Sequence, residues 1–493
     1  MRSGCPLAAA AQAHGSLPAL LTADHCWSFE EWHQATSQAA AALARTQLKV
    51  GDRVAVCAPS TGLAGIRQAV LFFAAWRRGL VVCPVSPRLP VDALRDRLDV
   101  LETQVWVHHE DMRLSTVEEA TVLDELVPLD GTTDEPLRIP DPGDLDPDAL
   151  ATLLWTSGST GHPRAAGHRL SQHLASARAS HDNVPFGPGC RWLASLSLHH
   201  VGGLSLLFRA IHGGGAVAFP STRETILDSL LRLGPTHLSL VSVQLHRLLQ
   251  RLPENARSEH PIVNQLSAVL VGGGPAPSTL LREAWARGVP VLTTYGSTET
   301  ASQVSTSLPG EPPAHPPSAG FPLGDNELRI DAGGELHIRG PSVLLGYWSN
   351  GRLHPATDPQ GWYRTGDLAA WSDQGQLLIA GRSDLRFTSG GESIHPETIE
   401  RALYDHPEIE QALVVPVPRE PWGYRPVLII RPAEGSRCPS LPGIKSYLRD
   451  RLVDFLIPDA VLAWPMNLYD TEQKPDRKRL QIFAQSRVVW NGC

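Results

Sequence analysis

Lysine is scarce in this chain of 493 residues. Only Lys49, Lys445, Lys474 and Lys478 occur among its 43 cationic residues, so arginine supplies almost all the positive charge. The formal net charge of −8 excludes a global basic field that would attract nucleic acid or an anionic membrane surface. Any polyanion that this protein binds must therefore be held at a local site, and a lysine inside a motif stands out.

Cysteine is also sparse and has no pattern. The seven cysteines are odd in number, scattered, and never spaced as C-x-x-C. This usage indicates neither a disulfide framework nor a zinc site, and it favours a reducing compartment. We therefore expect a cytoplasmic protein.

Long hydrophobic runs are missing as well. The most apolar segment, Ala69 to Trp76, spans eight residues and is followed by Arg77 and Arg78, whereas a membrane span needs roughly 20 residues. Residues Met1 to Ala11 lack the apolar core of a secretory signal. The sequence predicts a soluble protein with no membrane span and an ordinary mature N-terminus.

The composition is that of a folded globular protein, with 42% apolar and 19% charged residues. At roughly 100 to 200 residues per domain, the length suggests two to four domains. Helical and strand patterns alternate between residues 28 and 85: Ser28-Phe-Glu-Glu is typical of a capping box, Trp32 to Leu43 of a helix, and Arg53 to Cys57 of a buried strand. This rhythm predicts an α/β fold with a largely parallel sheet.

The same alternation returns from Ala151 to Tyr295, which predicts a second sheet-based α/β subdomain. After a proline- and glycine-rich stretch, Leu308 to Pro322, short alternating strands indicate a β-rich subdomain. Beyond Arg382 the pattern becomes α+β. We place a boundary at Asp384, which gives a large N-terminal domain (residues 1–383) and a small C-terminal domain (residues 384–493).

The sharpest local signal is Thr156-Ser-Gly-Ser-Thr-Gly-His-Pro-Arg164, which follows a predicted strand. Small hydroxyl and glycine residues allow backbone N–H groups and hydroxyls to surround a phosphate. The spacing differs from G-x-x-x-x-G-K-[ST], and no lysine follows Gly161. Taken alone, the segment is equally consistent with an ordinary loop.

Six further motifs follow along the chain, and together they favour a phosphate-binding loop over an ordinary loop. They are Gly272-Gly-Gly-Pro-Ala-Pro277, Tyr295-Gly-Ser-Thr-Glu-Thr300, Tyr363-Arg-Thr-Gly-Asp-Leu368, Gly381-Arg-Ser-Asp384, Ser389-Gly-Gly-Glu-Ser-Ile394 and Gln473-Lys-Pro-Asp-Arg477. With them the chain resembles the adenylate-forming superfamily of acyl-CoA synthetases, luciferases and peptide-synthetase adenylation domains along nearly its whole length. The resemblance implies an ATP-dependent, AMP-forming acid–CoA ligase that uses ATP, CoA and Mg²⁺.

The resemblance also implies roles at the nucleotide. Glu299 would ligate Mg²⁺, Thr298 would contact the α-phosphate, Asp367 would accept hydrogen bonds from the ribose hydroxyls, and Arg382 would hold the nucleotide from the other side. The implied β- and γ-phosphate loop comprises Thr156, Ser157, Gly158, Ser159, Thr160 and Gly161. The implied adenine site comprises Tyr295, Gly296, Gly272, Gly273 and Gly274.

In the C-terminal domain, the resemblance makes Lys474 the catalytic lysine, which neutralises charge that grows on the α-phosphate and the substrate carboxylate. It makes Asp384 the hinge of a mobile domain, and it places the glycines Gly390 and Gly391 beside the pantetheine arm of CoA. Two positions depart from the family pattern: Gln473 replaces a common glycine, and Arg164 replaces a common lysine.

The segment Ser195 to Arg209 would line the acyl pocket, and it contains no acidic residue. That absence counts against an amino-acid substrate, whose ammonium group needs a carboxylate partner. His200-Val-Gly-Gly-Leu-Ser205, followed by Arg209, is similar to the pattern of 2-succinylbenzoate–CoA ligases of menaquinone and phylloquinone biosynthesis, except that Gly202 replaces a serine. The implied substrate-binding residues are His200, Gly203, Arg209 and Ser302.

Two alternatives stay open at this point. One is an acyl-CoA synthetase for another aromatic or medium-chain acid, and the other is a non-catalytic relative that binds nucleotide without turnover. The expected partner is a small carboxylic acid rather than a nucleic acid or a membrane. The sequence leaves the oligomeric state open.

Overall fold

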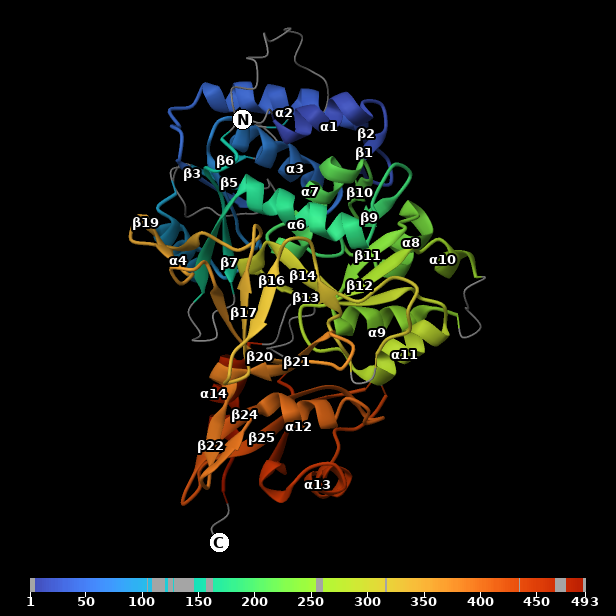
Figure 1. The fold of residues 1–493 in the computed structure, drawn as a ribbon, viewed down its shortest axis with the longest axis vertical. Coiled ribbons are helices and arrows are strands. Elements are labelled where there is room, and N and C mark those ends of the chain that lie inside the picture. Colours follow the sequence, from blue (N-terminus) through green and yellow to red (C-terminus); the bar gives the residue numbers. More distant parts are fainter. Residues whose placement is uncertain are drawn as a thin grey trace.

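The computed structural model describes residues 5–103, 105–108, 120–122, 127, 146–156, 163–253, 260–314, 317–433, 435–465 and 476–490. Figure 1 shows a large body that contains the blue to yellow segments, with a smaller orange and red body below it. The predicted segments 157–161 and Lys474 lie outside the described residues.

The first large sheet has eight strands in the order β19-β18-β8-β7-β4-β3-β5-β6. The pairs from β7 through β6 across the sheet are parallel, whereas β8, β18 and β19 add antiparallel strands at the other edge. The strands are β3 (Arg53–Cys57), β4 (Val81–Pro84), β5 (Val105–His108), β6 (Ala120–Val122), β7 (Leu150–Thr156), β8 (Arg164–Arg169), β18 (Gly346–Ser349) and β19 (Arg352–Pro355). Its connecting helices are α3 (Gly62–Arg77) and α4 (Val91–Leu101).

The second large sheet has nine strands in the order β15-β14-β13-β12-β11-β9-β10-β1-β2. Its strands are β1 (Pro18–Leu21), β2 (Cys26–Ser28), β9 (Arg191–Leu193), β10 (Ala216–Ala218), β11 (His237–Leu240), β12 (Ala268–Val271), β13 (Val291–Ser297), β14 (Ser302–Thr306) and β15 (Phe321–Pro322). The accompanying helices are α1 (Pro6–His14), α2 (Phe29–Ala44), α6 (Leu170–Asn183), α7 (Val201–Gly213), α8 (Ile226–Leu233), α9 (Ser242–Arg251), α10 (Pro261–Asn264) and α11 (Ser278–Ala286).

One hydrophobic core joins the two sheets through α3 and α7. The ring centroids of Phe73 and Trp76 lie 4.8 Å apart, and those of Trp76 and Phe208 lie 5.3 Å apart. This core includes Val54 of the first sheet and Leu270 of the second. Burial of large aromatic side chains therefore fixes the relative position of the two sheets.

The predicted β-rich part is an antiparallel sheet of four strands. It consists of β16 (Glu327–Ile330), β17 (Glu335–Arg339), β20 (Tyr363–Trp371) and β21 (Leu377–Arg382). The last strand leads through a short 3₁₀ helix, η2 (Ser383–Leu385), into the small body.

The small body has its own five-stranded sheet and its own hydrophobic clusters. Its elements are β22 (Phe387–Ser389), β23 (Glu392–Ile394), α12 (Pro396–Ala402), β24 (Ile409–Arg419), β25 (Gly423–Pro432), α13 (Leu441–Arg449), η3 (Asp454–Leu456), β26 (Ala460–Ala463) and α14 (Arg477–Arg487). The predicted fold class is thus confirmed: a large α/β N-terminal part and a small α+β C-terminal part. The boundary at Asp384 stays a prediction.

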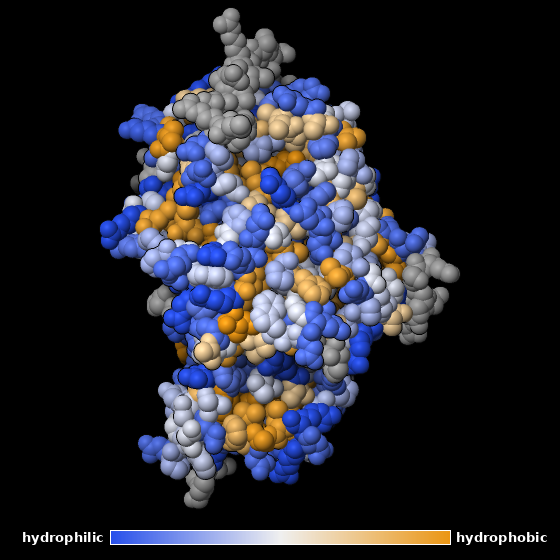
Figure 2. All heavy atoms as spheres, in the orientation of Figure 1, coloured by the Kyte–Doolittle hydropathy of each residue, from blue (hydrophilic) through white to orange (hydrophobic). Residues whose placement is uncertain are grey.

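No helix among the described residues is long and apolar enough to cross a membrane. Apolar and charged residues intermingle over the face drawn in Figure 2.

A buried ion pair joins α14 to the rest of the small domain. Arg477 donates to the carboxylate of Glu400 on α12 at 2.6 and 3.1 Å, and to the carbonyl of Val414 at 2.7 Å. Removal of one partner leaves a buried charge without compensation. The pair therefore ties the start of α14 to α12 and β24.

We expect Glu400→Ala to lower the free energy of unfolding of the small domain by about 3 kcal/mol, because Arg477 would keep its charge and lose its carboxylate. Hydrogen exchange of the β24 and β25 amides measures this loss. Glu327→Ala is the control, because it removes an ion pair with Arg339 in which the two side chains are 57% and 41% exposed. Equal effects of the two substitutions would contradict the account.

Candidate nucleotide and acid site

The backbone turn at Gly366 in β20 positions the side chain of Asp367. Gly366 has φ +74°, and a Cβ there would lie 2.8 Å from Nη2 of Arg382, so only glycine fits. The hydroxyl of Thr365 donates to the carbonyl of Leu336 at 2.7 Å and accepts the N–H of Asp367 at 3.0 Å. The backbone on both sides of the Asp367 carboxylate is therefore fixed.

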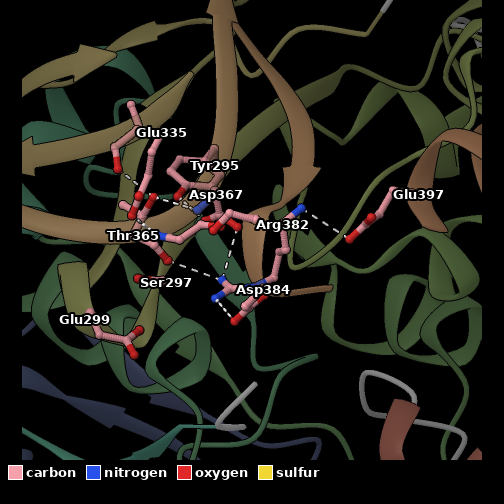
Figure 3. A network of polar contacts seen from close by, with 12 residues as sticks. Tyr295, Ser297, Glu299, Glu335, Thr365, Asp367, Arg382, Asp384 and Glu397 are labelled. Atoms are coloured by element: carbon pink, nitrogen blue, oxygen red, sulfur yellow. Dashed lines mark hydrogen bonds and ion pairs between the residues drawn. The ribbon is translucent and has the colours of Figure 1, made fainter. Parts of the chain in front are cut away.

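Asp367 meets two of the other predicted nucleotide residues, as Figure 3 shows. The hydroxyl of Tyr295 donates to Oδ2 at 2.5 Å, and Nη1 of Arg382 donates to Oδ1 at 3.1 Å. Burial and the Asp367 charge raise the pKa of Tyr295 well above its usual value, which keeps the phenol a donor. The fold thus brings β13, β20 and β21 together, although their motifs are far apart in the sequence.

Arg382 also faces the small domain. Its Nε and Nη2 donate to the two carboxylate oxygens of Asp384, both at 2.8 Å, and its backbone N–H donates to Glu397 of α12 at 3.3 Å. The hydrogen bonds to Asp384 raise the pKa of Arg382, so it is charged at any physiological pH. Figure 3 shows Arg382 between Asp367 and Asp384, with Glu397 at its backbone.

Glu299 lies on the short 3₁₀ helix η1 (Thr298–Thr300) between β13 and β14, and it is buried. Its Oε1 accepts a hydrogen bond from the hydroxyl of Tyr347 at 2.9 Å, and that hydroxyl lies 3.1 Å from the hydroxyl of Tyr363. Burial and the Glu299 charge raise the pKa of both tyrosines, so both stay protonated. Since the Tyr347 proton points to Glu299, Tyr363 donates to Tyr347.

Arg164 takes part in the same group, because its guanidinium carbon lies 3.9 Å from the centre of the Tyr347 ring. A guanidinium stacks on an aromatic face better than an ammonium does, which gives a local reason for arginine where the family often has lysine. Tyr347 and Tyr363 were not predicted as site residues. Tyr363 opens the motif that contains Asp367, but Tyr347 has no sequence signal beyond its place in a strand.

The described end of the phosphate loop contains an unpaired donor. Thr156 is the last residue of β7, and its buried hydroxyl has no hydrogen-bond partner among the described residues. The carboxylate of Glu299 is also buried. A hydroxyl without a partner fits a phosphate, and a buried carboxylate fits a magnesium ion.

Two of the predicted glycines, Gly272 and Gly296, are required by close packing between neighbouring strands. A Cβ on Gly272 would lie 2.7 Å from Thr294, and a Cβ on Gly296 would lie 1.8 Å from the carbonyl oxygen of Ser302. Gly273 adopts φ +76°, and Gly274 has open space beside it. The role of these glycines beside the adenine ring stays a prediction.

Arg209 on α7 is the most unusual charge in this region. The residue is 3% exposed, and its guanidinium carbon lies 4.6 Å from the centre of the Trp192 ring. Its Nη2 donates to Oε1 of Gln303 at 2.7 Å and to the hydroxyl of Ser302 at 3.4 Å. Its Nε and Nη1 have no partner among the described residues. Burial lowers the pKa of Arg209 to about 9, which still leaves it charged at neutral pH.

The remaining predicted residues have clear positions. His200 precedes α7 and lies 4.3 Å from the ring of His199. Gly203 lets α7 approach the preceding segment, because a Cβ there would lie 2.3 Å from the carbonyl oxygen of Ser197. Gly390 and Gly391, with φ +57° and +90°, form the turn between β22 and β23 in the small domain.

Comparison with known proteins agrees with this geometry. Residues 7–348 match the AMP-binding enzyme family, and residues 398–471 match the AMP-binding enzyme C-terminal domain. The chain belongs to the AMP-binding enzyme family. The predicted superfamily is thereby confirmed.

Within that family, the chain is similar to 2-succinylbenzoate–CoA ligases. It is 31% identical over 477 residues to that of Salmonella typhimurium, covering 93% of this chain and 98% of the relative. An arginine-to-lysine variant of E. coli MenE with bound OSB-AMS has a TM-score of 0.84 and 30% identity, with 99% of both chains covered. The Bacillus subtilis o-succinylbenzoate coenzyme A synthetase in complex with ATP and magnesium ion has a TM-score of 0.82 and 26% identity, with 97% and 99% covered.

We expect Tyr347→Phe to weaken metal binding about 10-fold, because the substitution removes the donor that orients the Glu299 carboxylate. Titration of Mn²⁺ by electron paramagnetic resonance, in the presence of an ATP analogue, measures the metal affinity directly. Tyr363→Phe is the matched control, since its hydroxyl reaches Glu299 only through Tyr347, and its effect is expected to be smaller. Unchanged Mn²⁺ affinity in Tyr347→Phe would show that this hydroxyl does not position the ligand.

Proposed function

We propose that this chain is a 2-succinylbenzoate–CoA ligase, an ATP-dependent, AMP-forming enzyme of the cytoplasm. The observation that carries the substrate assignment is the buried Arg209, whose described partners are neutral and whose Nε and Nη1 are unpaired. A guanidinium in this state is suited to a carboxylate. An acid with two carboxylates would offer one for reaction and one for Arg209.

In the first half-reaction, an oxygen of the reacting carboxylate attacks the α-phosphorus of ATP, an acyl-adenylate forms, and pyrophosphate leaves. We assign Asp367 to the ribose hydroxyls, Tyr295 to the adenine ring, and Thr298 and Lys474 to the α-phosphate. When bound at Glu299, Mg²⁺ would neutralise charge on the phosphate oxygens. Asp367 accepts hydrogen bonds from Tyr295 and Arg382, and a two-oxygen carboxylate is the kind of acceptor that a pair of ribose hydroxyls requires.

In the second half-reaction, the CoA thiolate attacks the acyl carbonyl carbon, a thioester forms, and AMP leaves. The site must exclude water during adenylation and later admit the pantetheine arm, so one fixed wall cannot serve both steps. We propose that the small domain rotates about Asp384, which removes Lys474 and brings in Gly390 and Gly391.

Polar contacts join the two domains among the described residues, and such contacts are compatible with a rotation. Thr279 donates to Asp405 at 2.7 Å, and the backbone N–H of Arg382 donates to Glu397 at 3.3 Å. Arg247 lies 4.0 Å from Glu410. Rotation would break these polar contacts.

We expect the wild-type enzyme to release pyrophosphate with 2-succinylbenzoate at a kcat/KM at least about 100-fold above that with benzoate or octanoate, because only the diacid can occupy Arg209 while it reacts. A coupled pyrophosphate assay across a panel of acids, with and without CoA, measures this preference. A clear preference for benzoate or octanoate would replace the proposal with an acyl-CoA synthetase for another acid. Nucleotide binding without turnover of any acid would indicate a non-catalytic relative.

Two substitutions should separate the half-reactions in opposite ways. Lys474→Ala should slow adenylate formation by orders of magnitude and largely spare thioester formation from a supplied acyl-adenylate.

Asp384→Pro should spare adenylation and impair thioester formation, because proline restricts φ at the proposed hinge. Single-turnover assays of each half-reaction provide the measurement.

Asp384→Ala is the control for the hinge variant, since it removes the same carboxylate from Arg382 without restricting the backbone. Thioester formation in Asp384→Pro at the rate of Asp384→Ala would remove the hinge assignment. Equal losses in both half-reactions for Lys474→Ala would contradict its separate role.

A further inference from the structure

The partner that holds Arg209 is a neutral amide, whereas Arg431, the other arginine that is buried among the described residues, lies 3.7 Å from the carboxylate of Glu410. The half-buried Arg477 and Arg425 also have acidic partners, Glu400 at 2.6 Å and Asp459 at 2.7 Å. A carboxylate partner is the usual solution for a buried guanidinium, because it offsets the cost of removing the charge from water. Arg209 has Gln303 in that place, at 2.7 Å.

The orientation of Gln303 is fixed by its other hydrogen bonds. Its Oε1 also accepts a hydrogen bond from Ser180 at 2.8 Å, and its Nε2 donates to the hydroxyls of Thr294 and Thr306, both at 3.0 Å. The side chain is buried. Both the oxygen and the nitrogen of the side-chain amide therefore make hydrogen bonds, and the oxygen is directed at the guanidinium of Arg209.

Gln303 also connects the acid site to the metal site. It lies directly after Ser302, the other contact of Arg209, and only four residues after Glu299. The connection between β13 and β14 therefore carries both the proposed metal ligand and two contacts of Arg209.

We propose that Gln303 is a specificity-determining residue, which orients Arg209 through a neutral oxygen and so keeps the positive charge available for the non-reacting carboxylate of the substrate. This inference rests on the proposed function and deepens it. A glutamate at position 303 has the same shape as glutamine and would accept a hydrogen bond from the same guanidinium N–H. Its negative charge would neutralise the positive charge of Arg209. The buried site would then repel a second carboxylate.

The test compares Gln303→Glu with Gln303→Met, which has a similar length and no charge. The substrates are 2-succinylbenzoate and the two monoacids that each lack one of its carboxylates. The monoacid that still forms an adenylate identifies which carboxylate reacts, and it serves as the matched substrate. The readouts are kcat and KM for each acid, and the Kd of Mg-ATP as a check on the nucleotide site.

We expect Gln303→Glu to reduce the preference for the diacid over the matched monoacid on the order of 100-fold, through KM, with the Kd of Mg-ATP unchanged. Gln303→Met should retain part of that preference, since Arg209 keeps its charge although it loses the oxygen that orients it. A role in packing alone would instead lower activity with both acids and would leave their ratio unchanged.

Three outcomes would overturn the inference. The preference for the diacid could be unchanged in Gln303→Glu, or it could be lost as fully in Gln303→Met as in Gln303→Glu. The third is a loss of preference in Gln303→Glu that appears only in kcat and not in KM. Failure of the proposed function is distinguishable, because a wild-type enzyme without any preference for the diacid would reveal it before any variant is compared.

Discussion

The connection between β13 and β14 is the constraint on which both halves of the site depend. It turns sharply enough that Ala301 and Ser302 adopt positive φ values of 50° and 116°, and a Cβ on Gly296 would lie 1.8 Å from the carbonyl oxygen of Ser302. Residues before the turn face the nucleotide region, whereas Ser302 and the next residue face Arg209. A displacement of this turn would move the proposed metal ligand and the proposed acid-binding residues together.

The unneutralised charge of Arg209 is the costly part of this arrangement. A buried charge without an anion is expensive, and the neutral hydrogen bonds and the Trp192 face offset only part of that cost. In the proposed function, the non-reacting carboxylate of the substrate supplies the anion that is missing from the described partners of Arg209.

The sequence predicted the elements whose signals are local. The capping box at Ser28 forms as expected, and the helix predicted from Trp32 to Leu43 spans Phe29–Ala44. The strand Arg53–Cys57 has the predicted bounds. Helix α14 (Arg477–Arg487) was not predicted, because its first residues are basic and its stability comes from the tertiary pair with Glu400.

Within the site, the sequence identified side chains through motifs, and the fold brings Tyr295, Asp367 and Arg382 into direct contact. It did not identify Tyr347 or Gln303. Their significance comes from hydrogen bonds across different strands and helices, and such pairings depend on how the sheets are packed. The partner of a buried polar group can be read only from tertiary structure.

The most direct test of the account is a crystal structure of the enzyme with 2-succinylbenzoate and a non-hydrolysable ATP analogue. The account predicts that the non-reacting carboxylate lies within about 3.2 Å of Nε or Nη1 of Arg209. The contact from Nη2 to Gln303 should persist, and the reacting carboxylate should face the α-phosphate. A non-reacting carboxylate bound elsewhere, with Arg209 paired to another group of the protein, would contradict it.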